Sequence, residues 1–294
     1  MSFLGVDIGG TASRFVLADA AGTILARGAA GGATGHIFNP VERDKLVAVL
    51  QSIAAALPPG TTLVSACLGI TGLGDKIRDE AATLIGSHLA LPAAAIRLTD
   101  DMELAYRAAF APGAGHLISA GTGSIGLHVA IDGRIIRVGG RGLLIDDGGS
   151  GTWIALTALD RLYRGIDETG STAGAQILAD ELFAAMGGDD WDATRAYVYG
   201  SDRGRIGALA QAVARAADQG DALALDILTQ AGAELARLGR ALVQRAGHRP
   251  IGYVGGIIDL HPAIRTSLAA ALPGETLLYP RLDAAAFAAQ WARG

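Results

Sequence analysis

The sequence has little cysteine and few aromatic residues. Its 294 residues include one cysteine, Cys67, and aromatic side chains make up 5% of the chain. A single cysteine excludes a disulfide within the chain and a metal site built from several cysteines. Cys67 lies in the apolar run from 62 to 70, and we expect a buried thiol there.

Clustered positive charge and long hydrophobic runs are also missing. The formal net charge is −5, and no group of Lys and Arg stands out, whereas proteins that bind nucleic acids usually carry a basic stripe. No segment approaches the ~18 consecutive apolar residues of a membrane span. The first residues, Met1 to Asp7, lack the basic and apolar regions of a signal peptide. We therefore expect a cytoplasmic protein with neither nucleic acid nor membrane as partner.

The chain is half apolar and only 18% charged, which is typical of a well-packed α/β protein. Hydrophobic periodicity in the first part predicts strands and helices in alternation. We expect strands at 3–8, 13–18, 23–27, 62–70 and 96–99, a glycine-rich loop at 28–35, and helices at 40–57, 75–89 and 101–110. In the remainder we expect strands at 116–120, 124–131, 134–138, 251–254 and 276–279, a glycine-rich loop at 139–151, and helices at 152–163, 172–186, 202–219, 221–247, 261–271 and 283–292.

The order of elements restarts in the second half. Gly10-Thr11-Ala12-Ser13 recurs 111 positions later as Gly121-Thr122-Gly123-Ser124, and the hairpin glycine Gly22 falls on Gly133 at the same offset. Such self-similarity predicts an internal duplication. We place the two domains at 1–114 and 115–294.

Each half opens with a glycine turn directly after a strand. Glycines at Gly9 and Gly10 let phosphate oxygens approach backbone N–H groups, and Thr11 adds a hydroxyl donor. Asp7, at the end of the strand, is suited to hold the water shell of a phosphate-bound Mg²⁺. An ordinary β-turn is the alternative for either turn alone. The repeated pair favours a site that binds the polyphosphate of a nucleotide.

Two other nucleotide motifs fit less well. The P-loop pattern Gly-x4-Gly-Lys-Ser/Thr is absent. Gly121-x-Gly123-x-x-Gly126 matches the dinucleotide-binding string, but that string must open a helix, and here it continues into a predicted strand.

The layout resembles the actin-like ATPase superfamily of sugar kinases, actin and Hsp70, and within it the N-acetylglucosamine kinase and BadF/BadG-type ATPase family. The resemblance covers nearly the whole chain. It rests on Asp7-x-Gly9-Gly10-Thr11, Thr99-Asp100-Asp101, Ser119-Ala120-Gly121-Thr122-Gly123-Ser124, Asp147-Gly148-Gly149-Ser150-Gly151-x-Trp153-Ile154-Ala155 and Gly255-Gly256. It implies a duplicated, ribonuclease H-like α/β fold of two domains with a cleft between them, and a last helix, 283–292, that packs back on the first domain.

The resemblance also implies site residues. ATP phosphates would be bound by Gly9, Gly10, Thr11, Ser13, Gly121, Thr122 and Gly123, and adenosine by Gly255 and Gly256. Asp101 would be the general base, since a small residue, Ala105, follows it by four positions; Asp100, its neighbour, is the alternative. One of the two carboxylates is expected to be a helix N-cap. The sugar would be bound by Thr71, Gly72, Asp101 and Asp147, although Asp147 could equally be an N-cap or a loop residue.

The chain departs from this family at one position. The family usually has a sugar-contacting Asn in the loop after the third strand. That position falls here on Gly35 or His36, with Asn39 a possible replacement. We interpret His36 and His128 as structural or surface residues.

The resemblance implies an ATP- and Mg²⁺-dependent kinase of N-acetylglucosamine or glucosamine, and we expect it to form a homodimer. Two alternatives remain. A BadF/BadG-type activator would need two cysteines per subunit for a shared iron–sulfur cluster, and this chain has one. A sugar or nucleotide sensor would keep the fold without the chemistry.

Overall fold

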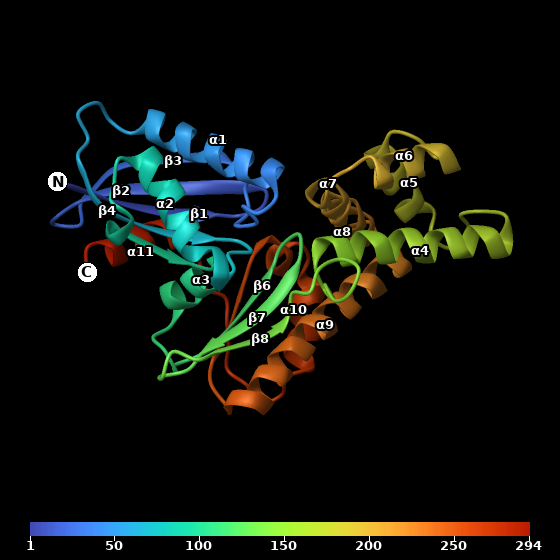
Figure 1. The fold of residues 1–294 in the computed structure, drawn as a ribbon. Coiled ribbons are helices and arrows are strands. Elements are labelled where there is room, and N and C mark those ends of the chain that lie inside the picture. Colours follow the sequence, from blue (N-terminus) through green and yellow to red (C-terminus); the bar gives the residue numbers. More distant parts are fainter. The chain divides into compact units, whose positions relative to one another are not determined.

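The chain folds into two compact units. The computed structural model describes residues 1–294. One unit comprises Met1–Ala111 together with Arg281–Gly294, and the other comprises Pro112–Pro280 (Figure 1). The first unit is thus completed by the last residues of the chain. Each unit contains one five-stranded sheet.

The first sheet has the strand order β3-β2-β1-β4-β5. Its strands are β1 (Ser2–Ile8), β2 (Ala12–Asp19), β3 (Ile24–Gly31), β4 (Leu63–Ile70) and β5 (Ile96–Thr99). Strands β1, β2 and β3 form an antiparallel meander, while β4 pairs in parallel with both β1 and β5. Parallel strands β1, β4 and β5 therefore end at the same edge of the sheet.

Helices cover both faces of this sheet, which explains the continuous apolar run in β4. The helices of this first unit are α1 (Pro40–Ala56), α2 (Arg78–Leu89), α3 (Asp101–Ala109) and α11 (Ala284–Ala292). Leu68 packs in a core with α1 and α2, whereas the neighbouring Cys67 packs with Leu104 of α3 and Ala288 of α11. The expected buried thiol is confirmed.

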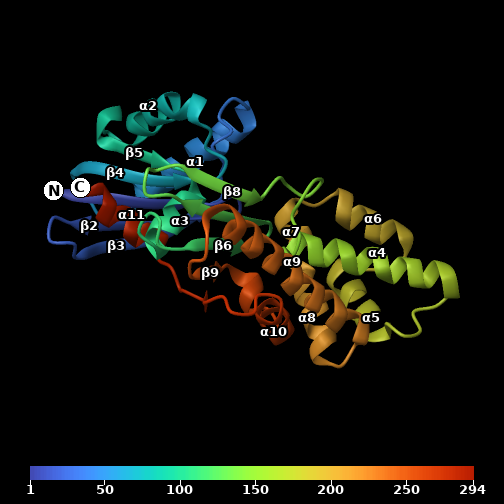
Figure 2. The same ribbon diagram turned by 90° about the horizontal axis from the view of Figure 1, so that it is seen from below.

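Helix α11 lies against β1, and the backbones approach closely there (Figure 2). A Cβ placed on Gly5 would lie 2.0 Å from the backbone nitrogen of Ala289. A side chain at position 5 would therefore push α11 off the sheet.

The second sheet has the strand order β10-β9-β6-β7-β8. Its strands are β6 (His116–Ala120), β7 (Ser124–Val129), β8 (Ile135–Gly139), β9 (Ile251–Val254) and β10 (Leu277–Leu278). Strands β6, β7 and β8 are antiparallel, and β9 is parallel to both β6 and β10. Strand for strand this repeats the first sheet, so the predicted duplication is confirmed.

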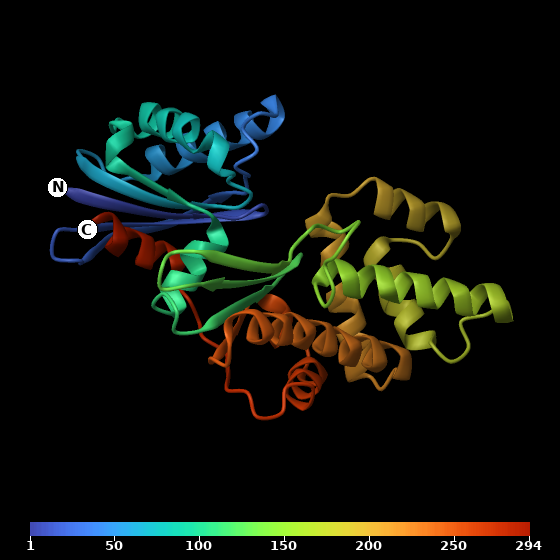
Figure 3. The same ribbon diagram turned by 60° about the horizontal axis from the view of Figure 1, so that its bottom comes forward.

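The second unit is rich in helices. They are α4 (Gly151–Thr169), α5 (Gln176–Met186), α6 (Trp191–Tyr199), α7 (Arg203–Ala208), α8 (Ala210–Asp218), α9 (Ala222–Ala246) and α10 (Pro262–Ala270). Helix α9 packs along β6, β7 and β8 (Figure 3), and one continuous core joins it to α4, α5 and α8. No helix of the chain combines the length and the apolar character needed to cross a bilayer.

Three predictions of secondary structure were wrong. Strand β3 continues to Gly31 through the expected glycine loop, because Gly28 pairs with Phe15 and lies under its ring: a Cβ there would be 2.3 Å from Phe15 Cε1. The helix expected at 202–219 is broken at Leu209, after two residues with low helix propensity, Gly204 and Gly207. Helix α6 was missed because only Tyr197 of its residues is buried, so it has no apolar periodicity.

Candidate active site

The first glycine turn joins β1 to β2 and presents its backbone to solvent. A hydrogen bond of 3.1 Å from Gly9 N to Ala12 O closes it, and no hydrogen bond engages the N–H of Gly10 or Thr11. Gly10 and Thr11 are exposed. Two free N–H groups beside a threonine hydroxyl form the kind of concavity that binds an anion.

Ser13 and Gly32 hold the first turn in place. Ser13 is buried and its hydroxyl donates to Gly31 O at 2.7 Å, so it braces the turn instead of facing solvent. A Cβ on Gly32 would lie 2.3 Å from Gly10 O. The glycine at 32 is therefore required for the backbone to pass beneath the turn.

The second turn, between β6 and β7, is tied to the start of α4. Gly151 N donates to Gly121 O at 2.9 Å, and the Thr152 hydroxyl donates to Thr122 O at 2.7 Å. Ser124 repeats the role of its counterpart in the first turn, since it is buried and donates to Gly148 O at 2.7 Å. The carbonyls of this turn are bonded, while no hydrogen bond engages the N–H of Thr122 or Gly123.

The two C-terminal glycines lie next to the second turn. Gly255 has a φ of 100°, and a Cβ on it would lie 2.3 Å from Ala120 O, immediately before the turn. Gly256 follows at the start of a short 3-10 helix, Gly256–Asp259, and no atom outside its immediate neighbours would meet its Cβ. Only glycine allows this approach of β9 to β6.

Carboxylates gather at the edge where β1, β4 and β5 end. Asp7 is on β1, Thr71 follows β4, and Asp100 and Asp101 follow β5. Asp100 is the N-cap of α3 and its carboxylate accepts from Met102 N at 3.1 Å. The expectation that one of the two aspartates caps the helix is met by Asp100.

Asp101 has the more unusual environment. Its carboxylate accepts from Met102 N at 2.9 Å, and the Thr71 hydroxyl is near enough to lower its pKa. Burial, together with the negative charges of Asp100 and Asp7, raises the pKa of Asp101 to about 7. Burial also raises the pKa of Asp7, against the influence of Arg14. A carboxylate whose pKa lies near 7 is suited to accept a proton at neutral pH.

The loop before α1 lies against Thr71 and Gly72. Gly35 N donates to Thr71 O at 2.8 Å, and a Cβ on Gly72, whose φ is 71°, would lie 2.7 Å from His36 Nε2. Asn39, the other candidate for the family's asparagine, is the N-cap of α1, and its side-chain oxygen accepts from Val41 N at 3.0 Å. The exposed imidazole of His36 is the polar group that lies beside Gly72. From the sequence we interpreted His36 only as a structural or surface residue.

Asp147, which we expect from the resemblance to bind the sugar, lies beside the second glycine turn. Its side chain is 3% exposed and is paired with Arg203, which is 45% exposed. Asp147 Oδ1 also accepts from Ser124 N at 3.5 Å. A Cβ on Gly123 would lie 2.4 Å from Arg203 Nη2. Burial raises the pKa of Asp147, and the Arg203 guanidinium opposes that rise.

Arg203 is a candidate residue that the sequence analysis missed. It is 56 positions from Asp147, in no motif, at the first position of a six-residue helix. The one local signal in the sequence is Asp202, whose N-cap position predicts where the helix starts. It does not predict that the Arg203 side chain reaches Asp147.

No group of three or more His, Cys, Asp or Glu side chains is placed to hold a metal ion. A magnesium ion that enters with nucleotide phosphates needs fewer protein ligands, since it keeps several waters. Asp7, next to the first turn, fits that lesser role.

Comparisons with known proteins agree with this architecture. A profile of the BadF/BadG/BcrA/BcrD ATPase family matches residues 4–292. A search of curated proteins gave no significant match.

Among solved structures, a protein from Chromobacterium violaceum, provisionally described as an N-acetylglucosamine kinase, is similar with 26% identity and a TM-score of 0.77, over 99% of this chain and 98% of that one. A protein from Porphyromonas gingivalis with the same provisional description has 16% identity and a TM-score of 0.74 over the same shares. A ROK family glucokinase from Streptomyces griseus, solved with glucose and AMPPNP, has 18% identity and a TM-score of 0.61, again over 99% and 98%. The last two show the shared fold.

Proposed function

Because the chain belongs to the BadF/BadG/BcrA/BcrD ATPase family, we propose that it is an ATP-dependent kinase that phosphorylates a sugar hydroxyl. The observation that carries the proposal is Asp101. It is a carboxylate with a pKa of about 7, at the edge of the sheet that also carries an open phosphate-binding turn.

In the proposed reaction Asp101 accepts the proton of the attacking hydroxyl. Phosphoryl transfer asks little more of the protein than positioning, charge neutralisation and such a base. The hydrogen bond from Met102 N holds one oxygen of the Asp101 carboxylate in place. A proton taken up at neutral pH can be released again after transfer, since the pKa of Asp101 lies near the pH of the solution.

Nucleotide binding is assigned to the two turns. The free N–H groups of Gly10 and Thr11, and those of Thr122 and Gly123, are the donors for phosphate oxygens. Gly255 and Gly256 would contact adenosine, and Asp7 would hold the water shell of Mg²⁺, which neutralises phosphate charge when bound. Arg203 adds a partly exposed cation next to Gly123, and we assign it to the same phosphates.

N-acetylglucosamine or glucosamine is the substrate that we propose. The support is the likeness at 26% identity to the Chromobacterium violaceum protein. The position of the family's asparagine falls on Gly35 or His36 of this chain, and the His36 ring lies beside Gly72. We therefore expect the His36 imidazole, together with Thr71 and Gly72, to contact the sugar.

An activator that shares an iron–sulfur cluster fits this chain poorly. Its single cysteine is buried, and burial raises the pKa of the Cys67 thiol to about 12. Cluster ligands are thiolates, and a thiol with so high a pKa stays protonated at neutral pH. A sensor without chemistry would have no use for a carboxylate poised like Asp101.

A coupled ADP-release assay tests the proposal. Purified protein with ATP and Mg²⁺ is offered N-acetylglucosamine, glucosamine, glucose and galactose, and the phosphorylated sugar is measured by mass spectrometry. We expect ADP and sugar phosphate in equal amounts with an amino sugar. ATP hydrolysis without any sugar phosphate across the panel would contradict a kinase.

A further inference from the structure

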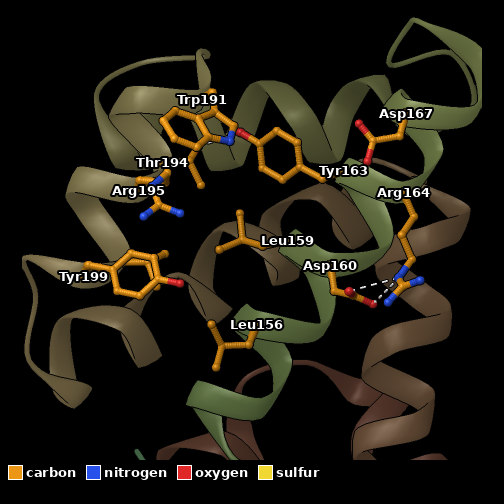
Figure 4. A pocket seen from close by; sticks show the side chains of 11 residues that line it. Leu156, Leu159, Asp160, Tyr163, Arg164, Asp167, Trp191, Thr194, Arg195 and Tyr199 are labelled. Atoms are coloured by element: carbon orange, nitrogen blue, oxygen red, sulfur yellow. Dashed lines mark hydrogen bonds and ion pairs between the residues drawn. The ribbon is translucent and has the colours of Figure 1, made fainter.

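Two cavities of similar size lie in the second unit, and they differ in charge. One, of about 590 Å³ between α4 and α6, has two arginines and two carboxylates in its lining, and its Asp160 and Arg164 are paired at 2.9 Å (Figure 4). The other, of about 570 Å³, is lined by three arginines and one carboxylate: Arg134, Arg245, Arg249 and Asp132. This second cavity is therefore positively charged, in a chain whose net charge is −5.

The positively charged cavity lies away from the phosphate turns. Its two sides are the hairpin that joins β7 to β8 and the end of α9 with the residues that follow it. Gly113, before β6, and the hairpin, after β7, lie at one end of these two strands, whereas the second phosphate turn lies at the other end. A ligand in this cavity would leave the second turn free.

Backbone carbonyls hold two of the arginines in place. Arg249 donates from Nε to Gly113 O at 3.0 Å and from Nη1 to His248 O at 2.6 Å. Arg245 donates from Nη1 to Arg137 O at 3.0 Å. No carboxylate forms an ion pair with Arg245 or Arg249. The remaining N–H groups of both side chains are therefore oriented donors, and the planar guanidinium matches the oxygens of a phosphate.

Two buried histidines lie on the protein side of this cavity. His128 lines it, is 5% exposed, and is hydrogen-bonded through Nδ1 to Gly115 O at 2.8 Å. The ring of His116 packs against His128, with 4.9 Å between the centroids, and His116 Nδ1 is buried without a hydrogen-bond partner. Such a nitrogen is costly unless water or a ligand reaches it. Burial lowers the pKa of His116, and the positive charge of Arg249 lowers it further.

We propose that this cavity binds the phosphate group of a small molecule, with Arg245 and Arg249 donating to its oxygens and Arg134 adding a third positive charge. Three cations against one carboxylate favour a dianion over a singly charged ligand. A volume of about 570 Å³ is typical of a small-molecule site. Ile131 and Ile136 also line the cavity and would contact an organic group that the phosphate carries.

Isothermal titration calorimetry of the full chain, with Mg²⁺ and ADP in excess to occupy the phosphate turns, tests the site. The probes are inorganic phosphate and glycerol 3-phosphate, at low ionic strength because salt screens exposed arginines. We expect one equivalent bound per chain, and the double variant Arg245→Gln/Arg249→Gln should weaken binding by about 30-fold or more, since it removes charge-assisted hydrogen bonds. Tighter binding of glycerol 3-phosphate would identify an organic phosphate as the ligand, and equal affinities would identify inorganic phosphate.

Two variants at the hairpin shift the affinity in opposite directions without touching the fold. The Arg134 side chain is 70% exposed and pairs only with Asp132, at 3.8 Å, so Arg134→Gln should weaken binding about fivefold. Asp132→Asn removes the one carboxylate and should tighten binding about threefold, while the hairpin is kept because Asn-Gly forms the same turn as Asp-Gly. Arg164→Gln is the matched control, since this arginine is 73% exposed on α4; it should leave the affinity unchanged.

Three outcomes would overturn the proposal: no binding of either phosphate, binding that neither the double variant nor Arg134→Gln weakens, or malonate, a dicarboxylate, bound as tightly as phosphate. Melting temperatures measured without ligand verify that each variant is folded. Bound phosphate should raise the melting temperature of the original chain but not that of the double variant. If the double variant is unstable, Arg134→Gln and Asp132→Asn still decide, because their opposite shifts require a bound anion at this hairpin.

Discussion

The two phosphate turns share their topology but differ in the charges around them. Beside the first turn lie three carboxylates, Asp7, Asp100 and Asp101, and burial together with the charges of the other two raises the pKa of Asp101 to about 7. Beside the second turn, the buried carboxylate of Asp147 is paired with Arg203. Under the proposed function both turns would hold phosphate, while the side chains around them would serve different purposes: proton transfer at the first turn and anion binding at the second.

The largest effect expected from this difference concerns Asp101. Asp101→Asn removes the proton acceptor and should lower kcat about 10³-fold, while ADP binding, measured by calorimetry, stays near that of the original chain because the turns are untouched. Unchanged turnover would contradict the assignment of the base.

The stability of the same variant is a second readout. Folding raises the pKa of Asp101, so the folded chain favours the protonated carboxyl, and the associated stability is present at low pH and lost as the pH rises through about 7. Asp101→Asn should therefore raise the melting temperature relative to the original chain more at pH 8 than at pH 5. A lower melting temperature at both pH values would indicate that the loss of activity is structural.

The next effect concerns the glycines beneath the turns. Gly255→Ala combines a left-handed backbone with a contact of 2.3 Å to Ala120 O, and should destabilise the protein by about 3 kcal/mol. Gly32→Ala meets a similar contact beneath the first turn but without a positive φ, so about 1–2 kcal/mol is expected. Chemical denaturation measures both. If the two substitutions lower the free energy of unfolding equally, the positive φ at position 255 does not contribute to the cost of Gly255→Ala.

A smaller effect is expected where the second turn holds its ion pair. Arg203→Met leaves the Asp147 carboxylate buried without its partner, at a cost of about 1–2 kcal/mol since the arginine is partly in water. The unpaired Asp147 carboxylate can lose its charge by binding a proton. The loss of stability in Arg203→Met should therefore be larger at pH 8 than at pH 5. It should shrink in the double variant Arg203→Met/Asp147→Asn. A KM for ATP that is unchanged in Arg203→Met would rule out contact with the phosphates.

The smallest effect is a shift of the pH profile. Asp100→Asn keeps the N-cap, because Asn caps as well as Asp, but removes the negative charge next to Asp101. The acid limb of kcat/KM, set by the need for an ionised base, should move to lower pH by less than about one unit. A limb that stays in place would show that the charge of Asp100 does not contribute to the pKa of Asp101.

Sequence patterns predicted the duplicated sheets because a strand, a glycine turn and a hairpin leave local signals. The sequence patterns did not predict the full length of β3. There the Phe15 ring, from the neighbouring strand, packs on Gly28, and the glycine-containing segment is extended. They failed again at α6, whose exposed face carries no apolar periodicity.

The candidate site divides in the same way. Asp7, the turns and the Asp100-Asp101 pair were recognisable because each lies within a short motif. The pairing of Asp147 with Arg203, and the placement of His36 over Gly72, join residues far apart in the chain, and only the folded backbone brings them together.

The packing of α11 on β1, tight enough to require glycine at position 5, has a consequence for biosynthesis. In translation β1 is made long before α11, so the part of the first sheet that α11 covers stays exposed while all of the second unit is made. The second unit, continuous from Pro112 to Pro280, can complete its core before the first can. During translation the amino-terminal half therefore depends longest on protection from aggregation.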